Sequence, residues 1–262
     1  MPNVQAHPAD DLRPELGALK RSGVLLYGIT VYLLFFATFL YLIAFVGNFF
    51  VPISVDVGPS VPLAQALVID LLLVALFGVQ HTIMARTRFK LWLTKIIPQP
   101  AERSTFVLAA TLVIMTMIVL WKPIPTVLWD VSGGTLRNVL IGISLSGWAI
   151  VLWSTFLINH FDLFGLRQVM LCFQGKPYAP VEFVMPAIYR YVRHPMYLGL
   201  LIAFWVTPTM TVGHLVFAGA MTAYTLIGIQ FEERALRREH GESYRKYQKQ
   251  VSMIIPSFPR KE

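Results

Sequence analysis

The chain has 262 residues, of which 56% are hydrophobic and only 14% are charged. Soluble domains carry roughly 25% charged residues, so this deficit excludes an ordinary water-soluble enzyme and indicates a membrane protein. The net charge of +8 fits basic loops on one side of a membrane and does not call for nucleic-acid binding, while the single cysteine, Cys172, excludes an internal disulfide and a multi-cysteine metal site.

The first 23 residues read as a charged tail and not as a signal peptide. Charged residues such as Asp10, Arg13 and Lys20 come before the first apolar run. That run is longer than the apolar core of a signal peptide, and no small-residue cleavage site follows it. We therefore expect a cytoplasmic N-terminal tail over residues 1–23.

Four apolar runs follow, each close to the roughly 20 residues that a membrane-spanning helix needs. They cover residues 24–50, 63–84, 104–121 and 135–158, and together we expect them to supply four transmembrane helices within 24–158. Asp70 lies inside the second run, where a carboxylate is costly. We expect Asp70 to pair with a basic residue of a neighbouring helix in a structural role.

The remaining sequence alternates between polar and apolar stretches. Residues 159–194 are polar and rich in Gly and Pro, and loops of this length are usually functional, which predicts a cytoplasmic active-site loop. Apolar segments 195–206 and 212–231 predict a helical hairpin, followed by a charged cytoplasmic segment over 232–262. The fold class is therefore all-α: a single polytopic helical bundle of about six membrane segments, with the hairpin last.

Charge also predicts the orientation of the bundle. Lys and Arg are plentiful in the N-terminal tail, residues 86–103, residues 159–192 and the C-terminal tail, and scarce in the turns 51–62 and 122–134. Under the positive-inside rule both termini are cytoplasmic. We expect an integral protein of a bacterial inner membrane.

The start of the hairpin carries the most informative residues. Pro195 suits the first position of a helix, where its missing N–H is not needed. Arg193 and His194 then lie at the positive end of that helix, which favours a carboxylate or a polar cofactor tail. Gly199 allows close packing against the helix.

The far end of the hairpin should return to this point. Glu232 and Glu233 would then lie beside Arg193 and His194 at the cytoplasmic boundary, where they could bind a cation, an amine or ribose hydroxyls. A plain membrane anchor with an Arg–Glu pair would show the same arrangement. Physical reasoning alone does not choose between the two.

The combined pattern is specific. It consists of Arg193 to Gly199, the Glu232–Glu233 pair, and a Gly-x-x-Tyr-x-x-Tyr segment that includes Tyr244. It resembles the isoprenylcysteine carboxyl methyltransferase and phospholipid methyltransferase superfamily of membrane enzymes, over roughly residues 181–256. The resemblance implies that S-adenosyl-L-methionine binds to Arg193, His194, Pro195, Tyr197, Leu198, Gly199, Glu232, Glu233 and Tyr244.

Three upstream segments, residues 80–86, 102–105 and 159–168, are similar to the nurim-like branch of this superfamily, and more closely to the bacterial methanethiol S-methyltransferases. This likeness covers nearly the whole chain after Arg21. It implies methylation of methanethiol to dimethyl sulfide with S-adenosylhomocysteine as by-product. The implied partners are a small volatile thiol and the lipid bilayer, with no metal and no nucleic acid, and the oligomeric state stays open.

Methyl transfer to a thiol requires a thiolate, and an alkyl thiol has a pKa above the roughly 8.5 of cysteine, so a base or a positive field is needed. His81 ends the second span as a candidate base or as a structural hydrogen-bonder. His160 and Asp162 could act as a base and its orienting carboxylate if a turn forms near Gly165, or they are solvated loop groups. Arg167 could hold the thiolate or the cofactor carboxylate.

Three other functions stay open. The same cofactor could serve a lipid amine, a prenylcysteine or another thiol. A sterol-reductase-like enzyme would use NADPH, although Glu232 and Glu233 do not suit a phosphorylated cofactor. A non-catalytic nurim-like membrane protein would bind no S-adenosylmethionine.

Overall fold

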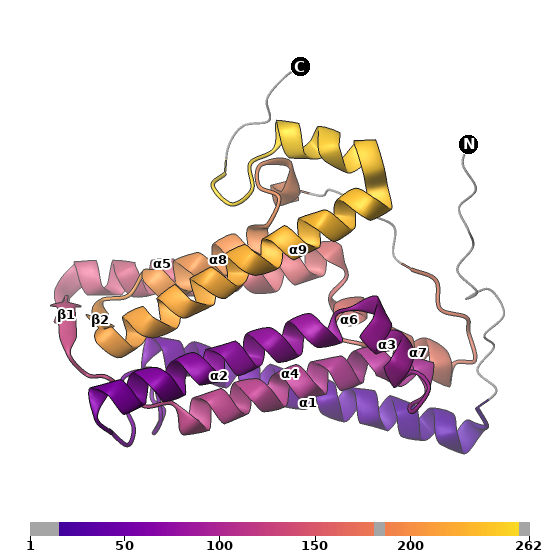
Figure 1. Ribbon diagram of the computed structural model, residues 1–262, viewed down its shortest axis with the longest axis horizontal. Coiled ribbons are helices and arrows are strands. Elements are labelled where there is room, and N and C mark those ends of the chain that lie inside the picture. Colours follow the sequence, from indigo (N-terminus) through magenta and orange to yellow (C-terminus); the bar gives the residue numbers. More distant parts are fainter. Residues whose placement is uncertain (1–15, 181–186, 257–262) are drawn as a thin grey trace.

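The computed structural model of the chain is a bundle of helices (Figure 1). It describes residues 16–180 and 187–256; residues 1–15 of the expected N-terminal tail, 181–186 of the expected active-site loop and 257–262 of the C-terminal segment lie outside the described residues. The elements, in chain order, are α1 (Ala18–Gly47), α2 (Leu63–Met84), α3 (Thr87–Leu93), the 3-10 turn η1 (Gln99–Ala101), α4 (Glu102–Leu120), β1 (Val127–Asp130), α5 (Gly134–Ile158), α6 (His160–Leu163), α7 (Leu166–Phe173), η2 (Ala187–Arg190), α8 (Pro195–Trp205), β2 (Thr209–Thr211) and α9 (Val212–Gln250).

Within the described residues, five helical stretches are long and apolar enough to cross a membrane: α1, α2, η1 with α4, α5, and the first 27 residues of α9. The sixth expected segment, α8, has 11 residues. It rises only about 16 Å, short of the roughly 30 Å hydrocarbon core of a bilayer. The prediction of an all-α polytopic membrane bundle is confirmed, but five described helices and not six are long enough to cross, because α8 is too short. The small β1–β2 sheet is an addition to the predicted fold.

The outward faces of the helices are apolar. On α1, Leu26, Leu33 and Leu40 follow one another at intervals of two turns, and each is at least half exposed. In a water-soluble protein such side chains would pack into a core. Their exposure along a whole helix indicates a surface that contacts lipid.

The two ends of the bundle differ. At one end β1 pairs with β2 in an antiparallel ribbon, with Val127 opposite Thr211 (Figure 1). At the other end lie the short helices α3, α6 and α7, and the last part of α9 folds back over the bundle beside η2 (Figure 1). The candidate catalytic residues of the 159–168 segment therefore lie at the end opposite the ribbon.

Aromatic side chains fill the core near the ribbon end. The rings of Phe45, Trp121 and Phe217 meet edge to face, with centroids 5.6–6.1 Å apart. The Trp121 indole N–H donates to the Val55 carbonyl at 3.1 Å, which satisfies its one polar group. This contact ties the 48–57 loop to the end of α4.

Asp70 does not form the ion pair that we expected. One of its carboxylate oxygens accepts the backbone N–H of Lys122 at 2.9 Å, and the side chain is fully buried. α4 ends at Leu120, so the chain after it needs partners outside the helix for its backbone donors. The structural role stands, but the partner is a peptide group and not a basic side chain.

α9 is much longer than the second arm of the predicted hairpin. Beyond residue 231 it continues to Gln250, because residues 232–250 are rich in Glu, Arg and Lys, which favour helices. The backbone of Gly241 adopts φ 55°, a left-handed conformation that glycine tolerates, and the helix axis turns there. The charged C-terminal segment is therefore a bent helix that returns to the bundle.

Two glycines bring α5 and α8 into direct backbone contact. A Cβ on Gly147 of α5 would lie 2.6 Å from the Gly199 carbonyl oxygen and 2.7 Å from the Ala203 nitrogen, and a Cβ on Gly199 would lie 2.6 Å from the Gly147 oxygen. Only glycine allows this approach. The contact determines where α8, and therefore Arg193 and His194 at its start, lie relative to α5.

We expect Gly147→Ala to destabilise the protein by about 1–3 kcal/mol, the usual effect of overpacking a close contact. Thermal unfolding in detergent micelles measures this. Gly142→Ala on the same helix is the matched control, because a Cβ there meets nothing within 4 Å. It should be neutral or slightly stabilising, since alanine favours helices over glycine by up to about 1 kcal/mol. Equal melting temperatures for the two variants would contradict the proposed contact.

Candidate active site

The start of α8 is hydrogen-bonded to the chain segment that follows α9. Pro195 is the first residue of α8, as the sequence predicted, and the His194 carbonyl accepts the Leu198 N–H at 3.0 Å. The backbone N–H groups of Arg193 and His194 donate to the carbonyls of Ser252 and Met253 at 2.9 and 3.1 Å. The segment before α8 is thus paired with the chain that follows α9.

Arg193 is the centre of a buried polar cluster. Its Nε donates to Glu233 Oε1 at 2.8 Å, and its Nη1 donates to the carbonyls of Gln248 and Val251 at 2.8 and 2.7 Å. The Gln248 amide in turn donates to Glu233 Oε2 at 2.7 Å. The prediction that the hairpin brings Arg193 next to Glu233 is confirmed, and both side chains are occupied by each other and by the end of α9.

Glu232 has a different environment from its neighbour. Its carboxylate accepts the Tyr197 hydroxyl at 3.0 Å and lies 3.8 Å from His194 Nδ1, while His194 Nε2 lies 3.2 Å from Glu233. The Glu232 side chain is 45% exposed, whereas that of Glu233 is 7% exposed. Glu232, which accepts from Tyr197, therefore forms the accessible part of the cluster, and His194 and Glu233 form its buried support.

Two tyrosines of α9 close the cluster. Tyr244 is almost fully buried and packs against Tyr247 at 5.8 Å between ring centroids. Burial raises the pKa of Tyr247 to about 12, so its phenol stays protonated, and it donates to the Tyr189 carbonyl at 2.6 Å. Burial also raises the pKa of Tyr244. Tyr247 thus holds the folded-back end of α9 against η2, and Tyr244 packs behind it.

His160 is buried and neutral. The Thr155 hydroxyl donates to the Leu152 carbonyl at 2.6 Å, so it accepts a hydrogen bond from His160 Nδ1 at 2.8 Å. This leaves the lone pair on Nε2, which accepts the Tyr32 hydroxyl at 2.8 Å. Burial lowers the pKa of the imidazole, in agreement with the neutral form. Both ring nitrogens of His160 are therefore occupied.

The predicted pairing of His160 with Asp162 is wrong. The two residues lie in the single-turn helix α6, where positions i and i+2 face different directions. Asp162 instead accepts Arg167 Nη1 at 2.9 Å and the Tyr178 hydroxyl at 3.3 Å. Arg167 Nη1 also donates to the Ala179 carbonyl at 2.9 Å, so Asp162 and Arg167 fasten residues 178–179 to α6 and α7.

His81 lies in an aromatic environment at the end of α2. Its ring centroid is 4.8 Å from that of Phe106, 5.3 Å from that of Phe77 and 6.4 Å from that of Tyr224. Its Nδ1 is buried and has no hydrogen-bond partner among the described residues. Of the three histidines proposed for the site, it is the one with a buried, unbonded ring nitrogen.

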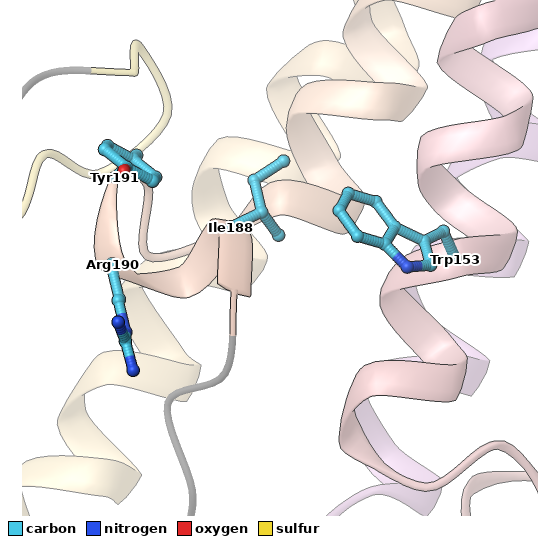
Figure 2. A pocket seen from close by; sticks show the side chains of 4 residues that line it. All are labelled: Trp153, Ile188, Arg190 and Tyr191. Carbon is cyan, nitrogen blue, oxygen red and sulfur yellow. The ribbon is translucent and has the colours of Figure 1, made fainter.

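An open pocket of about 400 Å³ lies between α5 and η2, lined by Trp153, Ile188, Arg190 and Tyr191 (Figure 2). Trp153 and Tyr191 are 48% and 44% exposed. Exposed Trp and Tyr near the ends of membrane helices are typical of the lipid–water interface. Three of the four lining residues directly precede Arg193 in the chain, so the pocket lies beside the polar cluster at the end of the bundle.

The NnrU protein family model matches residues 70–257. The chain belongs to the NnrU protein family. Methanethiol S-methyltransferase of Pseudomonas deceptionensis is 48% identical over 98% of both chains, and methanethiol S-methyltransferase 1 of Bradyrhizobium diazoefficiens is 49% identical over 88% of this chain and 81% of its own. Human nurim is 27% identical over 68% of this chain and 70% of its own. No solved structure matches the chain.

The NnrU match contains every candidate site residue from His81 to Tyr244. The structure joins Arg193, His194, Tyr197, Glu232 and Glu233 in one cluster, whereas Gly199 faces α5 and serves helix packing. Pro195 and Leu198 take part as residues of the first turn of α8. It also adds Gln248, Tyr32 and Thr155, which sequence reasoning missed. Tyr32 lies inside the first span of this NnrU protein. Because an unbonded hydroxyl is costly in lipid, its presence there could have indicated a polar partner in a neighbouring segment.

We expect Glu233→Ala to destabilise this NnrU protein by about 3–5 kcal/mol, because it leaves the Arg193 guanidinium buried without a counter-charge. Glu232→Ala is the matched control. Its carboxylate is nearly half exposed, so we expect a loss below about 1 kcal/mol. Thermal unfolding without added cofactor measures both, and a larger loss for Glu232→Ala would contradict the assignment of Glu233 as the buried support.

Proposed function

We propose that this chain catalyses the S-adenosyl-L-methionine-dependent methylation of methanethiol to dimethyl sulfide. The observation that carries the proposal is the 48% identity to a methanethiol S-methyltransferase over 98% of both chains. The cluster at the start of α8 supports it, since the residues that resemble a cofactor motif lie together there. The chain acts as a single membrane methyltransferase domain.

The accessible part of the cluster suits the cofactor. The half-exposed Glu232 carboxylate can accept hydrogen bonds from ribose hydroxyls or an ammonium group, and Tyr197 holds it in place. His194 precedes the N-terminus of α8, where the positive end of the helix favours a carboxylate. When bound, the cofactor supplies an electrophilic methyl group and a neutral leaving group. Arg193, Glu233 and Tyr244 keep the cluster in shape.

We propose that the residues that act on the thiol come from the chain before α8. The thiol must lose its proton before or during attack, and His81 and His160 are the two candidate bases. Asp162 and Arg167 hold residues 178–179 in place through the contacts described above. We assign them to positioning this segment.

Charge distribution supports the proposed orientation. The start of α1 with Lys20 and Arg21, the helix α3 with Arg88 and Lys90, and the bent part of α9 lie toward the end of the bundle opposite the β1–β2 ribbon (Figure 1). By the positive-inside rule that end faces the cytoplasm. We propose a bacterial inner-membrane protein with both termini in the cytoplasm.

Purified protein, given methanethiol and S-adenosylmethionine labelled in its transferable methyl group, should release labelled dimethyl sulfide. The volatile product is collected and counted, with heat-unfolded protein as the control. Folded protein that binds the cofactor but releases no labelled dimethyl sulfide would contradict the substrate. Folded protein that binds no cofactor would contradict the enzyme class.

Glu232→Gln should weaken S-adenosylmethionine binding about 10-fold, the effect of losing one or two hydrogen bonds to a charged acceptor. Its melting temperature should stay near that of the wild type, because the side chain is accessible. Calorimetric titration measures the affinity. Unchanged affinity in a folded variant would show that Glu232 does not face the cofactor.

A further inference from the structure

Unbonded polar atoms are concentrated in one part of the bundle. Among the described residues, most buried side-chain atoms without a hydrogen-bond partner lie at the end of α2, the start of α4 and in α7, at the end of the bundle opposite the β1–β2 ribbon (Figure 1). They belong to Gln80, His81, Glu102, Ser104 and Gln168. Leaving a buried polar atom unbonded is costly, and such groups in native proteins call for an explanation. The concentration indicates a place built to meet a polar or ionisable ligand.

Arg103 supplies positive charge to this place. Its guanidinium carbon lies 4.9 Å from the centroid of the Phe106 ring, and His81 packs on the same ring at 4.8 Å. Arg103 is held there because its Nε donates to the Leu163 carbonyl at 2.6 Å. An unbonded imidazole nitrogen and a fixed cation therefore share one aromatic neighbour.

Tyr224 connects His81 to the cofactor cluster. Its ring lies 5.3 Å from Phe77 and 6.4 Å from His81 between centroids, and it packs so closely on α2 that a Cβ on Gly78 would be 3.0 Å from it. Tyr224 belongs to α9, and α9 packs against α8, the helix of Tyr197, closely enough for the two phenols to interact electrostatically. Because Tyr197 donates to Glu232, His81 lies one side chain away from the residues proposed to bind the cofactor.

His160 lacks these features. Its Nδ1 donates to Thr155 and its Nε2 accepts from Tyr32, so taking up a proton would break an existing hydrogen bond. It is surrounded by Phe156 and Phe164, with ring centroids 4.1 and 4.8 Å away. The two imidazoles therefore differ. Both ring nitrogens of His160 are hydrogen-bonded, whereas Nδ1 of His81 can accept a proton without breaking a hydrogen bond.

We infer that the thiol acceptor binds between His81, Arg103 and Tyr224, and that His81 Nδ1 removes its proton. This inference rests on the proposed function and names the acceptor site within it. The S–H proton passes to Nδ1, and the thiolate formed is stabilised by the Arg103 charge. The thiolate electron pair then forms the new carbon–sulfur bond, while the pair of the broken sulfonium bond stays on the departing thioether. His81 releases its proton to water. Phe106 and Tyr224 limit the size of the acceptor.

An acceptor that needs no base tests the role of His81. Methaneselenol has nearly the shape of methanethiol but is ionised at neutral pH. His81→Asn keeps a polar atom near the Nδ1 position and removes the base, so turnover of methanethiol should fall about 100-fold or more, the usual contribution of a general base. Turnover of methaneselenol should fall less than about 10-fold, because no proton has to be removed. Equal losses for the two acceptors would overturn the assignment.

His160→Asn is the matched control. Since His160 is fully bonded, its replacement should lower thiol and selenol turnover by the same factor. Selective rescue of His160→Asn by the selenol would place the base at His160 and overturn the inference. Wild-type protein that binds S-adenosylmethionine but methylates neither acceptor would instead contradict the proposed function, so the two failures are distinguishable.

A second pair of variants tests the walls of the acceptor site. Phe106→Ala should raise the turnover of propanethiol relative to methanethiol about 10-fold, because it removes a ring beside His81. Phe164→Ala removes a ring beside His160 and should leave that ratio unchanged. Calorimetric binding of S-adenosylmethionine confirms that both variants are folded. A change of size preference in Phe164→Ala alone would overturn the proposed site.

Discussion

The buried ion pair between Arg193 and Glu233 is the interaction on which the candidate site depends. Arg193 precedes α8, Glu233 lies in the middle of α9, and the same guanidinium binds the carbonyls of Gln248 and Val251. Three separate parts of the chain therefore meet at one charge. A buried pair is costly to desolvate, and the hydrogen bonds of Arg193 to two backbone carbonyls and of Gln248 to Glu233 offset part of that cost. The main effect of the pair is to fix the positions of α8 and of the end of α9 relative to each other, and its net contribution to stability is small.

A second constraint places this geometry in the membrane. Gly147 and Gly199 let α5 and α8 touch along their backbones, so the start of α8 is positioned relative to the end of α5. His160 follows α5 directly, and Arg193 and His194 precede α8. The glycine contact thus relates the loop that carries His160 to the cluster around Arg193. Neither motif alone shows this relation.

Much of the fold and part of the site could be predicted from the sequence. Four apolar runs matched α1, α2, α4 and α5, because lipid requires long uninterrupted apolar helices. The hairpin predicted the meeting of Arg193 and Glu233, since antiparallel neighbours bring their ends together. The partners predicted for Asp70 and Asp162 were wrong for a common reason. Several donors are available to each carboxylate in the sequence, and only the folded chain determines which donor lies nearest.

The sequence by itself determined that this protein lies in a membrane, which segments cross it and which short motif carries the proposed cofactor chemistry, because these properties depend on composition and local spacing. Only the tertiary structure distinguished Glu232 from Glu233 and His81 from His160. In each pair the residue types are identical, and their chemistry differs through burial and hydrogen-bond partners contributed by distant parts of the chain. A second partner for His160, the Tyr32 hydroxyl, comes from a helix 128 residues away. Such contacts depend on how helices pack, and no local pattern encodes them.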